Sequence, residues 1–492
     1  MVDTGNPLFV VDANDPDQIR KDAWAFFSTW CPGSDDDDAA TIKSDFDSQK
    51  IDLWWLGARV SGLVQVYDLV APLDPDGRAA QYLERLRRIA GALLDNRDDH
   101  RAPPQHVDPF RERVMAAWGM VTPDRDGKWN TDPVTAGLCI YAMAAFARRV
   151  ADHPVRYAAH RGDAIRFITA VMETYQAFRP ELHLVEGDPE AYYTIPWRYA
   201  NLQCDGNSSC EAYRAQAGKA ISYNENLSMM KALAEVALAA DSALYRGSPD
   251  ATPERLQRAT VEAPLLIAKN VAFYVNHLRE NQLSDGTPYF QWDTQLPGKP
   301  QIQDIAHGGF ELDSLAVILD DQIRLNALLA RAGRAERIPL GPQHSDRFAN
   351  TFLRKIWRSD NTLSGRVDGE GDATHEGCGG WIQLAQSDPW VWIRARDATF
   401  SDTSNKLRPG SHAALLRYRR FNDMKYLTDF AGQNWLITPA ALAVGEPPPV
   451  SIHDQKWLLV LSGVVLANLK GDSSSQWEDP DRIVHPGYGG AG

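Results

Sequence analysis

Residues 223–241 read YNENLSMMKALAEVALAAD, and this stretch decides the fold. After its first turn, apolar residues occupy nearly every side of a helix, which indicates a helix that is buried all round. A second helical pattern follows at 260–278, and such pairs recur along the chain. In each pair one helix is nearly apolar and the other carries a charged face. This pattern predicts an inner, buried helix and an outer, half-exposed one.

The apolar helices begin near residues 54, 131, 223, 307, 381 and 454. This regular spacing, roughly 70–90 residues, is typical of an array of helical hairpins. The outer helices are predicted at 79–96, 163–178, 260–278, 345–357 and 412–431. Residues 1–50 supply a sixth outer helix, at 16–30, and close the ring. We therefore predict an all-α protein, an α/α toroid of about six helical hairpins. It forms one domain over 1–492, with a flexible tail at 485–492.

The composition disfavours several classes of partner. The chain has 51 Lys and Arg against 65 Asp and Glu, a net charge of −14, which opposes binding to nucleic acid or anionic membranes. No uninterrupted apolar run is long enough to span a membrane. The sequence contains no CxxC pair, P-loop or HExxH motif, so we expect neither a metal nor a cofactor. The oligomeric state is not predicted.

Two cysteines bear on the location of the protein. Cys204 and Cys210 bracket the polar loop CDGNSSC, where a disulfide and two free thiols are both compatible with the sequence. A disulfide favours export from the cytoplasm. The first residues, MVDTGNPLFVVDANDP, contain no basic and apolar signal segment. We expect a secreted or periplasmic protein whose signal peptide is not part of this sequence, with a cytoplasmic location as the alternative.

Four long connections lead from outer helices into inner ones, at 116–130, 186–210, 284–304 and 364–381. They are rich in Trp, Tyr, Gly and Asp. Because all four enter the N-terminal ends of inner helices, we expect them to collect on one face of the ring. Long loops in a compact domain are often functional. Aromatic rings stack on sugar faces, so Trp197, Trp292 and Trp381 are candidate substrate contacts.

Polar residues open several of the inner helices. QDIAHGGFELDSLAVI, at 303–318, contains Asp304 and His307 just ahead of an apolar run, with a glycine pair that would let a ligand approach the backbone. The helix at 223–241 opens with Tyr223, Asn224 and Glu225. Each of these residues alone is compatible with an ordinary helix cap. Their convergence on one face favours a site.

Two chemistries suit that face. β-Elimination from a uronate needs groups that neutralise the sugar carboxylate, together with a base and an acid. Asn224, His307, Tyr223 and Arg366 are candidates for these roles. Glycoside hydrolysis instead needs two carboxylates, more widely separated for inversion. Its candidates are Asp132, Glu225, Asp293, Asp304 and Glu376.

Three sequence blocks carry a resemblance: YNENLSMMKALAEVA, QDIAHGGFELDSLAV and DRFANTFLRKIW. Over roughly residues 190–395 the chain resembles α/α-toroid carbohydrate-active enzymes, most closely bacterial alginate and glucuronan lyases. The resemblance implies that Asn224 and His307 neutralise the substrate carboxylate and that Arg366 binds substrate. No Tyr lies between 358 and 400, so Tyr223 or Tyr289 would act as the base or acid.

We therefore expect a lyase that acts on an acidic polysaccharide or oligosaccharide. Asn224, His307, Tyr223 and Tyr289 are the candidate catalytic residues. The candidate substrate-binding residues are Arg366, Trp197, Trp292, Trp381, Asp304 and Glu225. The alternatives are an inverting glycoside hydrolase, a non-catalytic glycan-binding toroid and, more distantly, a toroid cyclase of isoprenoids.

Overall fold

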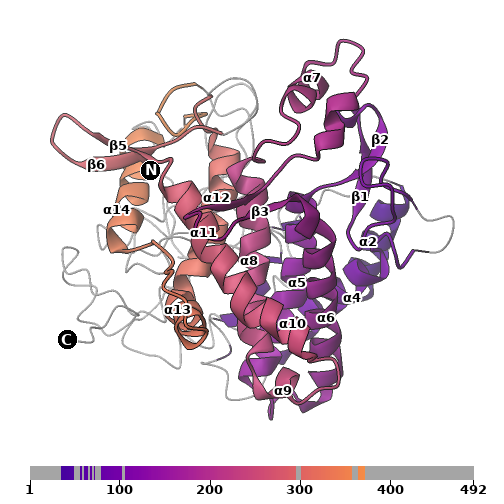
Figure 1. The fold of residues 1–492 in the computed structure, drawn as a ribbon. Coiled ribbons are helices and arrows are strands. Elements are labelled where there is room, and N and C mark those ends of the chain that lie inside the picture. The colour runs from indigo at the N-terminus through magenta and orange to yellow at the C-terminus, as the bar shows by residue number, and fades with distance from the viewer. Residues whose placement is uncertain are drawn as a thin grey trace, which may run out of the picture.

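The computed structural model describes residues 35–48, 79–101, 106–294, 301–356 and 364–371, together with single positions and short pieces between 56 and 71. The described chain is mostly helical, which confirms the all-α class (Figure 1). Several predicted features lie outside the described residues. These are the sixth outer helix at 16–30, the helices beginning near 381, 412 and 454, Trp381, Glu376 and the tail at 485–492.

Three inner helices form the centre of the described fold: α5 (Pro133–Asp152), α8 (Tyr223–Ala240) and α12 (Ile305–Asp320). Helix α8 packs against both α5 and α12, and nearly all of its side chains are buried. The outer helices are α4 (Ala80–Asp95), α6 (Arg161–Phe178) and α11 (Ala263–Val275). Helices α4 and α6 pack on α5, α11 packs on α8, and α4 and α6 are buried along one side. The predicted division into inner and outer helices is therefore confirmed for α5, α8 and α12 and for α4 and α6, whereas α11 is buried on nearly all sides rather than half-exposed.

The three inner helices run parallel and in register. Lys231 of α8 forms a buried ion pair with Asp313 of α12, and its ammonium lies 3.8 Å from the centre of the Tyr141 ring of α5. These three residues lie the same number of positions from the start of their helices. The first turns of α5, α8 and α12 consequently lie at the same end of the molecule.

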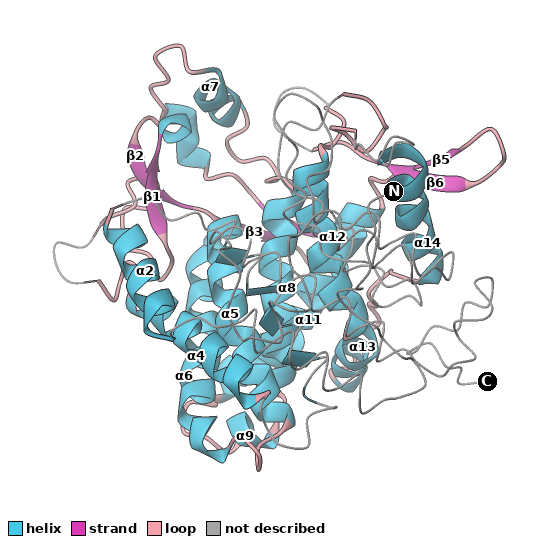
Figure 2. Cartoon of the chain, turned by 180° about the vertical axis from the view of Figure 1, so that it is seen from behind, coloured by secondary structure: helices cyan, strands magenta, loops and turns pink. Residues whose placement is uncertain are grey.

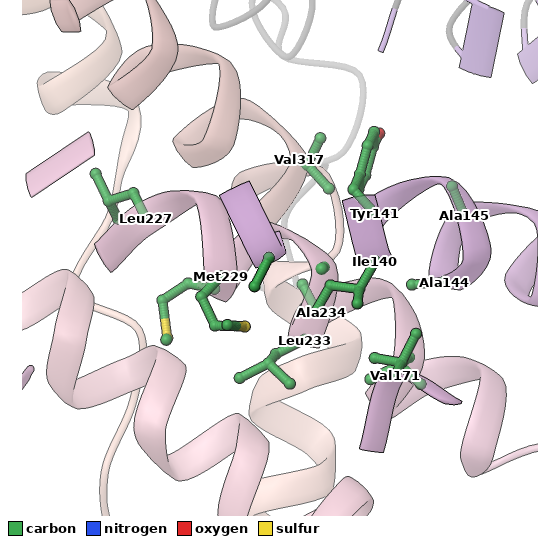
Figure 3. Packing of buried hydrophobic residues seen from close by; sticks show 14 of the residues in the cluster. Ile140, Tyr141, Ala144, Ala145, Val171, Leu227, Met229, Leu233, Ala234 and Val317 are labelled. Atoms are coloured by element: carbon green, nitrogen blue, oxygen red, sulfur yellow. The ribbon is translucent and has the colours of Figure 1, made fainter. Parts of the chain in front are cut away.

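The helices approach closely because small residues line their contacts. A Cβ atom at Gly137 of α5 would lie 2.6 Å from the backbone nitrogen of Met229 in α8, so only glycine permits this approach. Figure 3 shows Ile140 of α5, Leu233 of α8 and Val317 of α12 within one apolar cluster. Close packing of this kind makes the core intolerant of added volume.

A β-hairpin precedes each of the three inner helices, a feature that the helical patterns did not predict. The pairs are β1 (Gly119–Thr122) with β2 (Lys128–Thr131), β3 (Leu182–Leu184) with β4 (Ala191–Tyr193), and β5 (Arg279–Gln282) with β6 (Pro288–Gln291). Figure 2 shows the labelled strands towards one end of the helices and α9 (Ala243–Arg246) towards the other. The long connections therefore gather at one end, as predicted for the described part of the chain.

The segment after α12 differs from the prediction. Helix α13 (Gln322–Arg331), which was not predicted, follows α12 directly and packs against α11. The predicted outer helix at 345–357 is present as α14 (Pro342–Thr351) with a π-helical turn (Phe352–Ile356), but α14 packs mainly on β6. The remaining helices are α2 (Asp35–Asp47), α7 (Ser208–Ala215) and α10 (Pro253–Gln257), the last continued by a π-helical turn (Arg258–Glu262).

Candidate active site

The polar residues that open α5, α8 and α12, at 132–135, 222–226 and 304–308, are here called the rim. Each helix start is fixed by a side chain. The Asp132 carboxylate accepts the Thr135 backbone N–H at 2.7 Å. Asn226 donates to the carbonyls of Ile221 and Ser222 and accepts the backbone N–H of Tyr193, which ties α8 to β4. Capping of the helices explains why Asp132 and Asn226 are polar, but it does not explain the other polar residues of the rim.

Asp304 both caps α12 and holds the ring of His307. One carboxylate oxygen accepts the His307 backbone N–H at 2.9 Å, and the other lies 2.6 Å from Nδ1 of the same residue. This pairing assigns the proton to Nδ1 and the lone pair to Nε2. The His307 side chain is 48% exposed. The predicted cap and the predicted functional histidine are thus parts of one arrangement.

The glycine pair that follows His307 does not form an open loop. Gly308 and Gly309 are buried within the first turn of α12. The Gly308 N–H donates to the Asp304 carbonyl at 3.0 Å. This amide is therefore used by the helix, and the expected backbone contact with a ligand is not supported at Gly308.

Charge at the rim shifts the pKa of His307 upward from its ordinary value of 6.5. Partial burial on its own lowers this pKa, but the hydrogen bond to Asp304 and its negative charge outweigh the burial. Glu311 and Glu225 add smaller contributions in the same direction. The imidazole therefore titrates at a higher pH than an isolated histidine.

Glu225 is the second group at the rim whose pKa is shifted. It is half-buried in the first turn of α8, and burial raises its pKa to about 7. The negative charge of Asp132 adds to the shift, whereas Arg125 and His307 oppose it. These mutual effects place Glu225 between the starts of α5 and α12. A carboxyl with a pKa near neutrality can give or take a proton at physiological pH.

Arg125, whose positive charge opposes the rise in the pKa of Glu225, lies in the turn between β1 and β2. Its guanidinium stacks on the Tyr213 ring, with 3.2 Å between the carbon and the ring centre. Tyr213 belongs to α7, which begins at the Cys204–Cys210 disulfide. The structure thus selects the disulfide from the two possibilities that the sequence allowed. The bond anchors the segment that covers Arg125.

The other two predicted residues of the α8 start are buried. Asn224 is only 4% exposed, which counts against direct contact with a polymer. Tyr223 packs among the rings of Phe273, Tyr274 and His277. Burial, followed by the charge of nearby carboxylates, raises the pKa of Tyr223 above its ordinary value. Both effects favour the protonated phenol, which counts against Tyr223 as the base but not as the acid.

Two of the remaining predicted residues are unsuited to the roles assigned to them. Trp292 is 0% exposed and its indole N–H donates to Glu311, so its ring is closed to a sugar. Tyr289 lies on the opposite face of β6 from Phe290, beside Lys355, and the structure does not join it to the rim. The sequence did not predict the burial of Trp292 or the position of Tyr289, because it does not reveal which side chains of β6 and of the residue after it are covered.

Trp197 and Arg366 remain accessible. Trp197 is 66% exposed in the turn that precedes α7. The backbone of Arg366 pairs with that of Asp304, so this arginine begins beside the Asp304–His307 pair. Its guanidinium is paired with Asp368 at 3.0 Å, and the side chain is half-exposed.

Sequence reasoning missed Glu311. It lies four residues after His307 on the same face of α12, is fully buried, and accepts the Trp292 indole N–H at 2.7 Å. Burial raises the pKa of Glu311 to about 8, although the hydrogen bonds from Trp292 and Gln303 oppose the shift. The spacing His307-x-x-x-Glu311 was the only sequence signal, and inside an apolar run it reads as one polar position of a helix.

Within the described part of the chain, no group of three or more His, Cys, Asp or Glu side chains is arranged to hold a metal ion. Of the described helices, α5 alone has the length and apolar composition to cross a membrane, and it is buried in the helical core. Comparison with protein-family models, curated proteins and solved structures gave no match to this chain. The site must therefore be interpreted from its own geometry.

Proposed function

We propose that this protein is a polysaccharide lyase that cleaves a uronate-containing polymer by β-elimination at the rim of an α/α toroid. The Asp304–His307 pair carries the proposal, because an exposed imidazole oriented by a carboxylate is the arrangement of a general base. Three parallel inner helices, each entered through a β-hairpin, support the toroid.

In this mechanism the Nε2 lone pair of His307 removes the proton at C5 of the uronate. The C5–H electron pair forms the C4–C5 double bond as the C4–O bond breaks. Asp304 stabilises the imidazolium that forms, as carboxylates paired with histidine do in other enzymes. Glu225, with its pKa at about 7, gives a proton to the leaving oxygen.

The substrate carboxylate must be neutralised before C5 becomes acidic enough. Arg366 supports this role, because its backbone adjoins Asp304 and its side chain is half-exposed. A substrate carboxylate would compete with Asp368 for the guanidinium. The sequence predicted Asn224 and His307 for this role. The burial of Asn224, and the assignment of His307 as the base, make Arg366 the better candidate.

One observation favours a second function. Burial raises the pKa of Glu225 to about 7, and Asp132 is close enough for its carboxylate to add to that shift. Glycoside hydrolysis uses two carboxyl groups, of which one has a raised pKa. In an inverting hydrolase Glu225 would be the acid and Asp132 the base. Both proposals place the chemistry at the rim, and they differ in product. The Cys204–Cys210 disulfide supports an exported protein in either case.

The test is incubation of the purified protein with alginate, glucuronan, pectate and neutral glucans. A lyase produces the ultraviolet absorbance of an unsaturated uronate, whereas a hydrolase produces new reducing ends without it. Retention of a polymer on the protein with neither product would show glycan binding alone. Reducing ends without absorbance would contradict the lyase and favour the hydrolase.

A matched pair of variants locates the activity. His307→Ala should lower the rate of elimination by about 10²–10⁴-fold, the contribution expected of a general base. His183→Ala is the control, because His183 forms a similar pair with Asp188, at 2.9 Å, on the β3–β4 hairpin. Equal activity of the two variants would contradict the assignment of His307.

A further inference from the structure

The connection between β6 and α12 is closed by a buried carboxylate. Trp292 follows β6 and Gln303 precedes Asp304, and the Gln303 N–H donates to the Trp292 carbonyl at 2.9 Å. Inside this pair, the Thr294 N–H donates to the Gln301 carbonyl at 2.8 Å. The two ends of the connection therefore run antiparallel up to the rim.

Glu311 joins these two ends through both of its oxygens. One oxygen accepts the Trp292 indole N–H at 2.7 Å, and the other accepts the side-chain N–H of Gln303. The Tyr274 hydroxyl of α11 lies 3.4 Å from the first oxygen. Trp292, Gln303 and Glu311 are all fully buried, so water cannot replace these bonds without opening the core.

The next residue after Gln303 is Asp304, and it is held from both sides. Its backbone pairs with that of Arg366, and the Gln303 carbonyl accepts the Val367 N–H at 3.0 Å. Movement of Gln303 would thus move the carboxylate that orients His307. Glu311 lies on the same helix as His307, four residues further on, so it fixes Asp304 relative to the helix that carries the imidazole.

We propose that Glu311 is a positioning residue: by bridging Trp292 and Gln303 it holds Asp304 in the place from which it orients His307. The inference rests on the proposed function in taking His307 as the reacting group. Glu311 does not touch substrate in this account, because it is fully buried.

Four titratable groups besides Glu311 face the bridge. His307 and Asp304 face it from the start of α12, Tyr274 from α11 and Tyr223 from α8. A variant that removes the Glu311 carboxyl therefore alters the surroundings of His307 in two ways, through geometry and through the charge that the carboxyl acquires as the pH rises towards about 8. The experiment must separate the two.

Three variants separate geometry from charge. Glu311→Gln removes the ionisable group and, in the Gln303 orientation that the structure shows, places an amide N–H₂ against the N–H₂ of Gln303. Trp292→Phe removes one donor and leaves the carboxylate in place. The double variant Gln303→Glu with Glu311→Gln exchanges donor and acceptor, so the bond between positions 303 and 311 and the bond from Trp292 both form again.

The readout is the NMR titration of the His307 ring, which is assigned by its loss in His307→Ala. Glu311→Gln and Trp292→Phe should both lower the pKa of His307, because the bond to Asp304 is weakened, and the double variant should recover much of the shift. The elimination rate should fall about tenfold to a hundredfold in the single variants and recover in parallel. Glu235→Gln, which alters a buried carboxylate remote from the rim, should leave the His307 titration unchanged.

The outcomes are distinct. A shift of the His307 pKa in Glu311→Gln but not in Trp292→Phe would show an effect of charge alone and overturn the positioning role. A similar shift in Glu235→Gln would also overturn it, because general loosening of the core would then suffice. If the wild-type protein cleaves no uronate polymer but the titrations behave as expected, the proposed function fails and the positioning of His307 stands.

Discussion

The two ends of the inner helices bury charge by different means. The end away from the rim, near the last turns of α5, is here called the lower end. There Arg148 pairs with Asp152 at 2.6 Å and with Asp321 at 3.2 Å, and Arg149 pairs with Glu235 at 2.7 Å. At the other end, neither Glu225 of the rim nor Glu311, one turn further along α12, forms an ion pair with an arginine among the described residues. Neutral donors hold Glu311 instead.

The difference has a consequence for protonation. Burial raises the pKa of Glu235 as it does that of Glu311, but a guanidinium in contact with Glu235 opposes the shift and keeps its charge compensated. At the rim end of the helices only weaker effects oppose burial, which raises the pKa of Glu225 to about 7 and that of Glu311 to about 8. A network of ion pairs stabilises one geometry, whereas carboxyl groups with a pKa near neutrality can exchange protons. The lower end is therefore structural, and the rim is the candidate for chemistry.

The largest expected effect is on turnover, from Glu225→Gln. The amide cannot give a proton to the leaving oxygen, so the rate should fall about a hundredfold or more, with little change in the melting temperature. Wild-type turnover in this variant would remove Glu225 from the mechanism. His307 would then be the one rim residue with a shifted pKa that takes part in the proposed reaction.

Arg149→Met at the lower end should do the opposite. It leaves the buried Glu235 and the more exposed Asp68 without their common partner, and breaking such a buried pair costs about 3–5 kcal/mol of unfolding free energy. Chemical denaturation measures this loss. The activity of each folded molecule should be retained, and a selective loss of turnover would show that the two ends are not separate in function.

A smaller effect concerns the dependence of stability on pH. The pKa of Glu311 rises on folding from 4.5 to about 8, so its contribution to stability is complete below 4.5 and is lost as the pH rises through 8. Glu311→Gln should therefore flatten the fall in unfolding free energy between these limits by on the order of a few kcal/mol. Glu225 titrates in the same direction and should leave a residual slope. An unchanged slope in the variant would show that Glu311 is ionised throughout.

Much of the helical frame could be predicted from the sequence. The all-round apolar patterns placed α5, α8 and α12 correctly, because an inner helix has no polar face to disguise its period. Helix α13 was missed because the chain was paired by spacing alone, and the hairpins were missed because they are only three or four residues a strand. The order of elements was therefore more predictable than their local partners.

The candidate site was less predictable, and for a physical reason. Asp304 and His307 are close in sequence, so their pairing could be anticipated. Glu311 depends on Trp292, which approaches it only after β6 has folded back towards α12. The same burial closed Trp292 to a sugar. Which aromatic ring stays exposed is decided by packing between distant segments, and the sequence does not contain that information locally.

The most direct test of the central claim is the pH–rate profile of Asp304→Asn beside that of the wild-type protein on a uronate polymer. His307 must be neutral to remove a proton, so the wild-type rate should rise with pH through a pKa above 6.5. Without the Asp304 carboxylate, that limb should move to lower pH and the maximal rate should fall. An acidic limb that stays in place with an unchanged maximal rate would contradict the role of the Asp304–His307 pair.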